Sequence, residues 1–442
     1  MIGFAGPGFN IVSFCIAPGE ALVFAGRIQE STARGLMHGI SLKHARLLLA
    51  AAKHSSVTGA AAAINRSQTS VTKSLHDLER DVGVELFDRS AKGITLTGFG
   101  KALEKGALLA ADSFQRARGS VAPNTMQASP SISRFFEMDV SDRWLDAFLA
   151  VAEHQDTQAA ADELGITVAA ILVNIRKLED MLRQPLFERL PNATVPTSFA
   201  KTLVKEVKLA RMHLRHACDE INAMQGIKAG RVTFGSLPFS RTYLLPKAII
   251  RLREAYPDID VVTMEAPYAE LASALRCGDI DFLVSALDRD EPDSSLTRES
   301  LIYNRPCIVV RSGHPVTQLE SPTWKDLSKY EFVLQHKESP TRHMFEDALA
   351  ANGYEPPHYA VQTGSLLITR GILEETDMVT VLSAHQIYYE QKLDLLTTVD
   401  LPILNDSRPI GIIRRAQGSI PPAAEALLDE IRRVATELGP DI

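Results

Sequence analysis

Residues 60–89 read AAAAINRSQTSVTKSLHDLERDVGVELFDR, and this stretch decides how the first part of the chain folds. Ser67 belongs to the residue types that cap helix N-termini, and a helical pattern follows it over residues 68–81. The apolar residues that recur at helical spacing form the inward stripe of this helix: Val71, Leu75 and Leu78. Gly83 ends the helix, because glycine readily adopts the left-handed conformation found after helix C-termini. Off the stripe the helix is largely polar.

Shorter elements surround this helix. Apolar residues at positions 47, 48, 51 and 52 predict an earlier helix, residues 57–63 a short one, and Asn65-Arg66 a turn. After Gly83, Leu86-Phe87 fits the first strand of a hairpin, Lys92-Gly93 its tip, and residues 94–96 the returning strand. This order predicts a helix-turn-helix with a β-hairpin wing.

The chain repeats this pattern at an offset of 100 residues. Laying residues 40–101 (the first copy) over residues 140–201 (the second copy) requires no gap. Identical residues include Ala60/Ala160, Ala61/Ala161, Leu78/Leu178, Glu79/Glu179, Leu86/Leu186, Phe87/Phe187, Arg89/Arg189 and Thr97/Thr197. Two units are too few for a solenoid, so we expect two separate small domains.

The first copy resembles the DNA-binding domain of LysR-type transcriptional regulators. The residues that carry the resemblance are Ala60-Ala61, Ser67-Gln68, Leu78-Glu79, Leu86-Phe87-Asp88-Arg89 and Leu96-Thr97. Thr69 stands where family members usually have proline, which leaves open which bases are read. The resemblance implies a recognition helix that enters the major groove by its N-terminal end.

Candidate DNA-binding residues lie on and around this helix. Gln68 has the amide that reads adenine, Thr69 and Thr72 can touch base edges, and Lys73 suits a phosphate. The full set is Arg66, Ser67, Gln68, Thr69, Ser70, Thr72, Lys73, Arg89 and Lys92. The alternative is that these are solvated polar positions, and Arg89 is equally suited to buttressing the wing.

The second copy lacks this polar face. Thr167-Val168 replaces Ser67-Gln68, and Leu172-Val173 replaces Thr72-Lys73. The first copy has nine basic and five acidic residues, a net charge of +4, whereas the second has six and nine, a net charge of −3. Because phosphate neutralisation supplies most nonspecific affinity, we expect the first copy to bind DNA and the second to serve packing or spacing. Arg176 and Lys177 argue against this division.

The sequence predicts a multidomain protein with two all-α winged helix-turn-helix domains, a long linker helix and an α/β two-lobed domain. The expected boundaries are 1–36 (an extension, or a wrongly chosen start), 37–118, a linker at 119–139, 140–196, a linker helix at 197–229, and 230–442. Apolar residues repeat along the linker helix in steps of four and three from Leu203 to Met224. In the family this helix pairs two subunits, although a helix packed within its own chain would look the same.

From about Arg231 strands alternate with helices, which predicts a mostly parallel sheet. The expected strands are 232–236, 259–264, 281–285, 306–311, 331–334 and 378–382. This region resembles the LysR sensor, which has the type 2 periplasmic-binding-protein fold. The resemblance rests on Phe234-Gly235-Ser236, Leu244-Leu245-Pro246, Tyr256-Pro257, Gly278-Asp279-Ile280-Asp281 and Gly313-His314-Pro315.

The resemblance implies an effector between two lobes, at strand ends and helix N-termini. The effector-binding candidates are Ser236, Ser339, Thr341, Thr363 and Ser365. Simple helix capping is the alternative for each of them. Arg342 or Arg370 could pair with a carboxylate or be surface charges. Cys277 and Cys307 have no resolving partner at a recognisable spacing, which disfavours a redox sensor.

Composition narrows the remaining classes. The chain has 442 residues, a net charge of −7 and four dispersed cysteines, without a membrane-length apolar run or a basic signal-like start. Hydrolase, P-loop, zinc-protease and dinucleotide motifs are absent from it, which disfavours an enzyme and predicts neither metal nor cofactor. A solute-binding protein, or a regulator acting by sequestering a LysR partner, remains an alternative. We expect a cytoplasmic homodimer or homotetramer that binds promoter DNA and a small-molecule effector, possible contact with RNA polymerase, and no membrane association.

Overall fold

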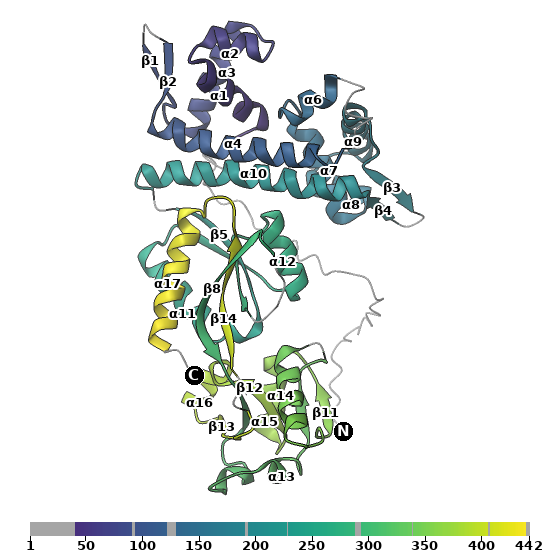
Figure 1. Ribbon diagram of the computed structural model, residues 1–442, viewed down its shortest axis with the longest axis vertical. Helices are drawn as coiled ribbons and strands as arrows, with labels where there is room; N and C mark the ends of the chain where they lie inside the picture. The colour runs from purple at the N-terminus through teal and green to yellow at the C-terminus, as the bar shows by residue number, and fades with distance from the viewer. Residues whose placement is uncertain are drawn as a thin grey trace, which may run out of the picture. The chain divides into compact units, whose positions relative to one another are not determined.

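The computed structural model describes residues 40–438 except 91–92, 122–129, 191–192, 228, 288–292, 338 and 405–406 (Figure 1). The predicted N-terminal extension, residues 1–36, lies outside the described residues. Among those described, no single helix is long and apolar enough to span a membrane, although one bent helix pair, Thr157–Leu164 with Val168–Leu182, meets the length and composition criteria.

The first copy folds as three helices followed by a hairpin. The elements are α1 (Leu42–His54), α2 (Val57–Ala63), α3 (Gln68–Val82), β1 (Phe87–Ser90) and β2 (Gly93–Leu96), and then the long helix α4 (Gly98–Arg118). Serines at positions 41, 56 and 67 cap the three helices by accepting a hydrogen bond from a backbone amide three residues later. Gly83 follows α3 with a φ of +79°, as the sequence predicts.

The second copy has the same order of elements. These are α7 (Asp142–His154), α8 (Thr157–Leu164), α9 (Val168–Leu182), β3 (Phe187–Leu190), β4 (Ala193–Pro196) and the long helix α10 (Ser198–Met224). The same backbone contacts recur, since the Ile94 amide donates to Ser55 O at 3.1 Å and the equivalent Thr194 amide donates to Gln155 O at 2.8 Å. Each copy also contains a two-stranded hairpin, so the two domains are not all-α, as the sequence-based class had it, but helical with a small β-sheet.

The segment expected to be a loop, residues 119–139, contains a helix, and the expectation was wrong there. Helix α6 spans Pro130–Phe136. Ile132, Phe135 and Phe136 recur at helical spacing and are fully buried or nearly so. The Phe114 and Phe135 ring centroids lie 5.3 Å apart, so α6 packs against α4. Burial of the apolar residues stabilises this short helix, although the surrounding Pro-, Ser- and Asn-rich sequence is typical of a loop.

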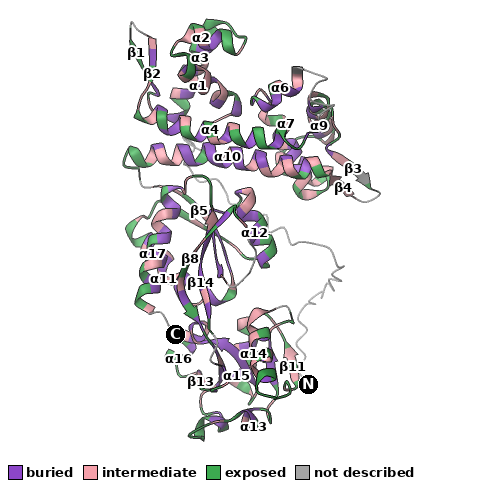
Figure 2. Cartoon of the chain, in the orientation of Figure 1, coloured by how far each residue is buried: buried purple, intermediate pink, exposed green. Residues whose placement is uncertain are grey.

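Helices α4 and α10 pack along each other and unite the two copies in one hydrophobic core. The core takes in Leu103, Ala107 and Phe114 of α4 and Leu203, Val207 and Leu214 of α10. Figure 2 shows buried residues along both helices. The apolar stripe predicted on the linker helix therefore packs within its own chain.

The sensor region forms two lobes, each with a five-stranded mixed sheet. The first sheet has the order β6-β5-β7-β14-β8, from β5 (Gly230–Ser236), β6 (Ile259–Met264), β7 (Phe282–Ala286), β8 (Leu296–Asn304) and β14 (Arg408–Arg415). Strands β5, β6 and β7 are parallel, and β14 is antiparallel to both β7 and β8. Helices α11 (Leu244–Ala255), α12 (Tyr268–Cys277) and α17 (Pro422–Leu438) complete this lobe.

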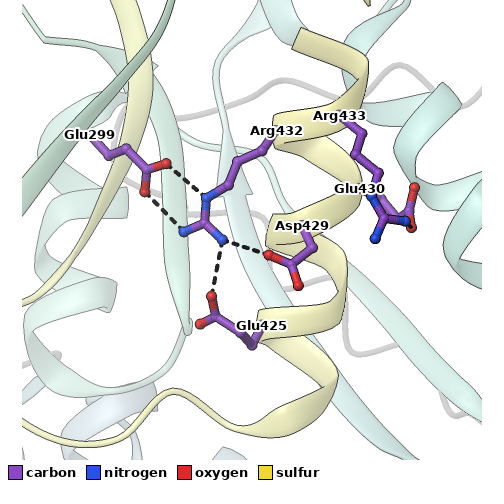
Figure 3. Close-up of polar contacts among 6 residues, drawn as sticks. All are labelled: Glu299, Glu425, Asp429, Glu430, Arg432 and Arg433. Atoms are coloured by element: carbon purple, nitrogen blue, oxygen red, sulfur yellow. Dashed lines mark hydrogen bonds and ion pairs between the residues drawn. The ribbon is translucent and has the colours of Figure 1, made fainter. Parts of the chain in front are cut away.

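An arginine ties α17 to the edge strand β8 (Figure 3). The Arg432 Nε and Nη2 atoms donate to the two carboxylate oxygens of Glu299 at 2.8 and 3.0 Å. Glu425 and Asp429, on the same helix, accept from Arg432 Nη1. These bonds raise the pKa of Arg432 and lower that of Glu299, so the network is charged throughout the physiological range.

The second lobe has the sheet order β11-β10-β12-β9-β13. Its strands are β9 (Pro306–Arg311), β10 (Phe332–Leu334), β11 (Tyr359–Gln362), β12 (Val379–Ser383) and β13 (Leu396–Val399). Its helices are α13 (Trp324–Leu327), α14 (Pro340–Ala351), α15 (Leu366–Glu375) and α16 (Tyr388–Lys392). The short 3₁₀ segments η1 (Pro238–Ser240), η2 (Pro315–Gln318) and η3 (Ala384–Ile387) complete the elements of the two lobes. The chain enters this lobe between β8 and β9 and leaves it between β13 and β14.

Candidate DNA-reading helix and effector site

The N-terminal turn of α3 presents an exposed polar surface. Arg66, Gln68, Thr69 and Lys73 are all exposed. The inward stripe holds the helix in place, since Val71 and Leu78 are fully buried. The first backbone N–H groups of a helix also carry a partial positive charge, which attracts phosphates. The start of α3 therefore combines the side-chain amide of Gln68, which suits a base edge, with the cations Arg66 and Lys73, which suit the DNA phosphates.

Two of the predicted side chains near this surface have structural partners. The Ser67 hydroxyl accepts from the Ser70 amide at 3.2 Å, and the Thr72 hydroxyl donates to Gln68 O at 3.0 Å. These contacts order the helix start and leave Ser67 with a capping role. Ser70 itself is exposed beside them.

Arg89, on the first wing strand, is held by Glu79 of α3. Its Nη2 atom lies 2.9 Å from Glu79 Oε2, while the other Glu79 carboxylate oxygen accepts from the amides of Leu86 and Phe87 at 3.0 and 3.2 Å. The Glu79 carboxylate thus joins α3 to β1, and Arg89 neutralises it. This geometry favours the buttress interpretation, although Arg89 stays 55% exposed. Lys92, at the predicted wing tip, lies outside the described residues.

Helix α9 of the second copy presents an apolar surface at the equivalent positions. Val173, the counterpart of Lys73, is 46% exposed, and Ile166 and Leu190 are also exposed. Val168 and Leu172 are half-buried. Exposed cations are present on this helix, since Arg176 and Lys177 lie on it and Lys177 Nζ is 5.9 Å from the Trp144 ring centroid. The second copy therefore matches the first in fold and differs in surface chemistry.

In the sensor region, Ser236 lies at the carboxyl end of β5 and is buried. Its hydroxyl accepts from Arg241 Nε at 3.1 Å, and its carbonyl accepts from Arg241 Nη2. Arg241 also lies 3.4 Å from Glu265, and burial lowers its pKa. This places a cation directly beside the predicted serine.

Several buried polar side chains that sequence analysis missed lie at the same edge of the first sheet. Ser285 is near the end of β7, Asn304 ends β8, and Arg408 begins β14, paired in register with Asn304. The β5 and β7 strands run parallel and β14 runs against them, so these residues share the edge with Ser236. The Ser285 hydroxyl and Asn304 Oδ1 are buried without a hydrogen-bond partner in the described structure. A polar residue near the end of an otherwise apolar strand, as in Phe282-Leu283-Val284-Ser285, is the signal in the sequence.

Thr341 connects this edge to the second lobe. Its hydroxyl accepts from Arg408 Nη2 at 3.3 Å, which joins β14 to the start of α14. Ser339 precedes α14 without a side-chain capping bond. Gln335 and His385 follow β10 and β12 in the same lobe, and Gln335 Oε1 and His385 Nε2 are buried without partners among the described residues. Ser236 and Thr341 are therefore brought to facing strand edges.

The other predicted effector residues have local partners. The Thr363 hydroxyl accepts from the Ser365 amide at 3.1 Å, and the Ser365 hydroxyl accepts from the Ile368 amide, so both satisfy the start of α15. Arg342 is buried, bonds to Glu346, Gln335 O and Gln362, and stacks on Tyr359. Arg370 pairs with Glu374 and Glu390. These contacts favour structural roles for both arginines.

Two surface concavities lie away from these residues. One of about 470 Å³ lies between α4 and Gly418-Ser419, and one of about 440 Å³ lies between residues 317–322 and 397–402. Neither includes a predicted effector residue. The strand-edge geometry, rather than an open cavity, therefore marks the candidate effector site.

The described cysteines have unreactive surroundings. Burial raises the pKa of Cys218 to about 11 and that of Cys307 to about 12. Burial also raises the pKa of Cys277. Because the thiolate is the reactive form, these environments disfavour a redox sensor at the three positions.

Comparison with known proteins matches both regions of the chain. The family described as "LysR substrate binding domain" matches residues 225–436. The family described as "Bacterial regulatory helix-turn-helix protein, lysR family" matches residues 42–101 and again residues 143–201.

Individual relatives match over most of their length. The HTH-type transcriptional regulator GalR of Pseudomonas putida is 32% identical over 400 residues, which cover 90% of this chain and 98% of that protein. PcaQ of Agrobacterium fabrum is 26% identical over 298 residues, 67% of this chain and 95% of that protein. A full-length OxyR variant of Pseudomonas aeruginosa has a similar fold, with a TM-score of 0.51 and 23% identity over 66% of this chain and 95% of that chain.

Proposed function

The chain belongs to the LysR family of transcriptional regulators, and from this premise we propose that its two winged helix-turn-helix units divide the work, the first reading promoter DNA and the second not. The protein is a DNA-binding transcription regulator whose activity a small-molecule effector modulates. Its relatives are named as transcriptional regulators rather than enzymes.

The duplication itself is supported by three features. The family description matches both segments, the two copies align without a gap, and each forms the same order of helices and strands. The alignment with GalR is also 102 residues longer than that with PcaQ, close to the offset of 100 between the copies. We infer that GalR shares the second unit.

The contrast between α3 and α9 carries the division of labour. Gln68 and Lys73 are exposed at the start of α3, whereas Val168 and Val173 stand at the equivalent positions of α9. The first copy has a net charge of +4 and the second −3, so only the first suits a polyanion. Arg66, Thr69 and Lys92 would add contacts around Gln68, and Arg89 would act through the wing.

The effector site is proposed at the facing strand edges of the two lobes. Ser236 with Arg241 supplies a hydroxyl and a cation from one lobe, and Thr341 supplies a hydroxyl from the other. The buried unpartnered atoms of Ser285, Asn304 and Gln335 add hydrogen-bonding capacity. A ligand bound to both edges would fix the angle between the lobes, which is how binding would reach the DNA-binding region.

Assembly and location follow from the family. We expect homo-oligomers, a cytoplasmic location where promoter DNA is accessible, and contact with RNA polymerase at the promoter.

A pair of matched double variants tests the division. Binding of the purified protein to the intergenic DNA upstream of its own gene is measured across a salt series for the wild type, for Gln68→Ala/Lys73→Ala, and for Val168→Ala/Val173→Ala at the equivalent positions. We expect the first variant to lose about 1–3 kcal/mol from the adenine contact and to reduce the salt slope by about 1. The second variant should bind like wild type.

Other outcomes have definite meanings. Equal losses in both folded variants would mean that both copies bind DNA. If the wild type shows no salt-dependent sequence preference, the reading role of α3 is wrong. Protein contacts through the exposed apolar residues of the second copy would then be the better function.

A further inference from the structure

The two long helices run antiparallel with a regular register. A Cβ atom placed at Gly98 would lie 3.6 Å from Met224 Cε, and one at Gly106 would lie 2.6 Å from the Ala217 Cβ. Further along, Arg116 Nε lies 2.9 Å from Glu206 Oε2. The partner's number falls as the α4 number rises, so the helices cross in opposite directions. Gly106 permits the closest approach.

This pairing is the one expected if a two-fold axis relates the two copies. Gly106 faces Ala217 and His213, and Arg116 faces Glu206. An offset of 100 places the equivalents of the Gly106 contact at residue 206 and residues 113–117, a range that includes the Arg116–Glu206 pair. Leu42 and Asp142, which are equivalent positions, lie close together, since the Leu42 backbone amide is near enough to lower the pKa that burial raises at the Asp142 carboxyl. A residue that contacts its own equivalent lies close to a two-fold axis.

The packing of α4 against α10 buries the apolar stripe of α10. Every stripe residue from Leu203 to Ile221 is buried within the chain, namely Leu203, Val207, Ala210, Leu214, Ala217 and Ile221. Glu206 is also buried and neutralised by Arg116, a residue of α4. This stripe therefore has no apolar surface left for the same helix of another subunit.

Helix-turn-helix proteins with two-fold symmetry read palindromic sites, because each symmetric half contributes a recognition helix. Here a two-fold relation exists inside one chain, but only α3 has a polar reading face. We propose that the two winged helix-turn-helix units of one chain together bind an asymmetric DNA site. Helix α3 contacts the bases of one half of this site, and α9 makes no base contacts in the other half. This proposal rests on the reading role of α3 proposed above.

The first experiment tests the internal pairing without DNA. Lys105 Nζ lies 4.0 Å from Glu220 Oε2; Lys105 is exposed and Glu220 is half-buried. A zero-length carbodiimide should join this amine to this carboxylate in the full-length protein. After denaturing electrophoresis, we expect the Lys105–Glu220 linked peptide in the band of one chain, near 48.4 kDa, and its loss in Glu220→Gln. Finding that peptide only in the band of twice this mass would overturn the proposal.

The second experiment tests the DNA site. Full-length protein selects from a library of duplexes with about 30 random base pairs, roughly three helical turns. We expect a motif without an inverted repeat whose half-sites lie one helical turn apart. Changing two of its base pairs should weaken binding about tenfold or more, because each mismatch in a site is costly. Changing the two base pairs one helical turn away, which the two-fold axis relates to the first two, should alter affinity less than about twofold.

The outcomes separate the two proposals. An inverted repeat with half-sites one turn apart would overturn the asymmetric site and leave DNA reading intact. Selection of no motif, together with the internal Lys105–Glu220 link, would overturn the reading role of α3 and keep the internal pairing. A motif that Gln68→Ala/Lys73→Ala still selects would show that α3 does not read it.

Discussion

The two winged units share one backbone plan and present opposite surfaces. Both close their wings with a Thr residue that caps the next helix, and both use a glutamate on the third helix to accept from the amide just before the first wing strand. They differ where the side chains face outward, at Gln68/Val168 and Lys73/Val173. The fold is thus set by caps and buried stripes, while the proposed reading of DNA depends on a few exposed positions that the fold does not require.

The largest expected effect tests the shared part of this comparison. Leu78 and Leu178 are equivalent, and both are fully buried. Leu→Ala at either position should lower the free energy of unfolding by about 2–5 kcal/mol, because each change leaves a cavity in a packed core. Urea unfolding followed by circular dichroism measures this. A loss at Leu178 well below that at Leu78 would show that the second unit is not folded like the first.

Sequence analysis predicted the elements of both units closely because their signals are local. Ser67, the Val71-Leu75-Leu78 stripe and Gly83 lie within one helix and its ends, and α3 forms where they indicate. The sequence does not decide what covers the α10 stripe, because an apolar stripe shows that a helix face is covered but not by which element. The structure shows that α4 of the same chain covers it.

The sensor was predicted less completely for a physical reason. Strands β8 and β14 pair over a separation of about 100 residues, and the β8 sequence LTRESLIYN is too polar to be marked as a strand by itself. The predicted effector-binding serines and threonines also rest on their position in the chain alone, because the sequence does not show which strand edges face each other. Arg408 reaches Thr341 across 67 residues of chain, and such a contact has no sequence signal.

The two long helices also differ in how they make the free energy of unfolding depend on pH, and this effect is smaller. Burial lowers the pKa of His213 to about 4, and the charges of His216, Arg415 and Arg116 add to this. Its equivalent in α4 is Ser113, which does not titrate in this range. The unfolded chain binds a proton on His213 below about pH 6.5, whereas the folded chain does so only near pH 4. Stability should therefore fall as pH drops from 6.5 to 4, by on the order of 3 kcal/mol from this group.

Unfolding of the wild type and His213→Gln across this pH range checks the assignment. The variant should lose less stability on acidification than the wild type, since it lacks the group that must stay neutral. Ser113→Ala serves as the matched control and should keep the wild-type pH slope. Identical slopes for all three proteins would show that His213 titrates normally in the folded state.

The smallest expected effect comes from moving the two proposed DNA-reading residues to the second unit. Val168→Gln/Val173→Lys restores the two side chains at the equivalent positions of α9, but it changes the net charge of the second copy only from −3 to −2. Phosphate contacts supply much of the affinity, so we expect DNA binding to change less than about twofold in the salt series. In the Gln68→Ala/Lys73→Ala background, the same transfer should fail to restore binding. Full restoration would mean that two exposed residues alone separate the units, and that the acidic surface around α9 does not matter.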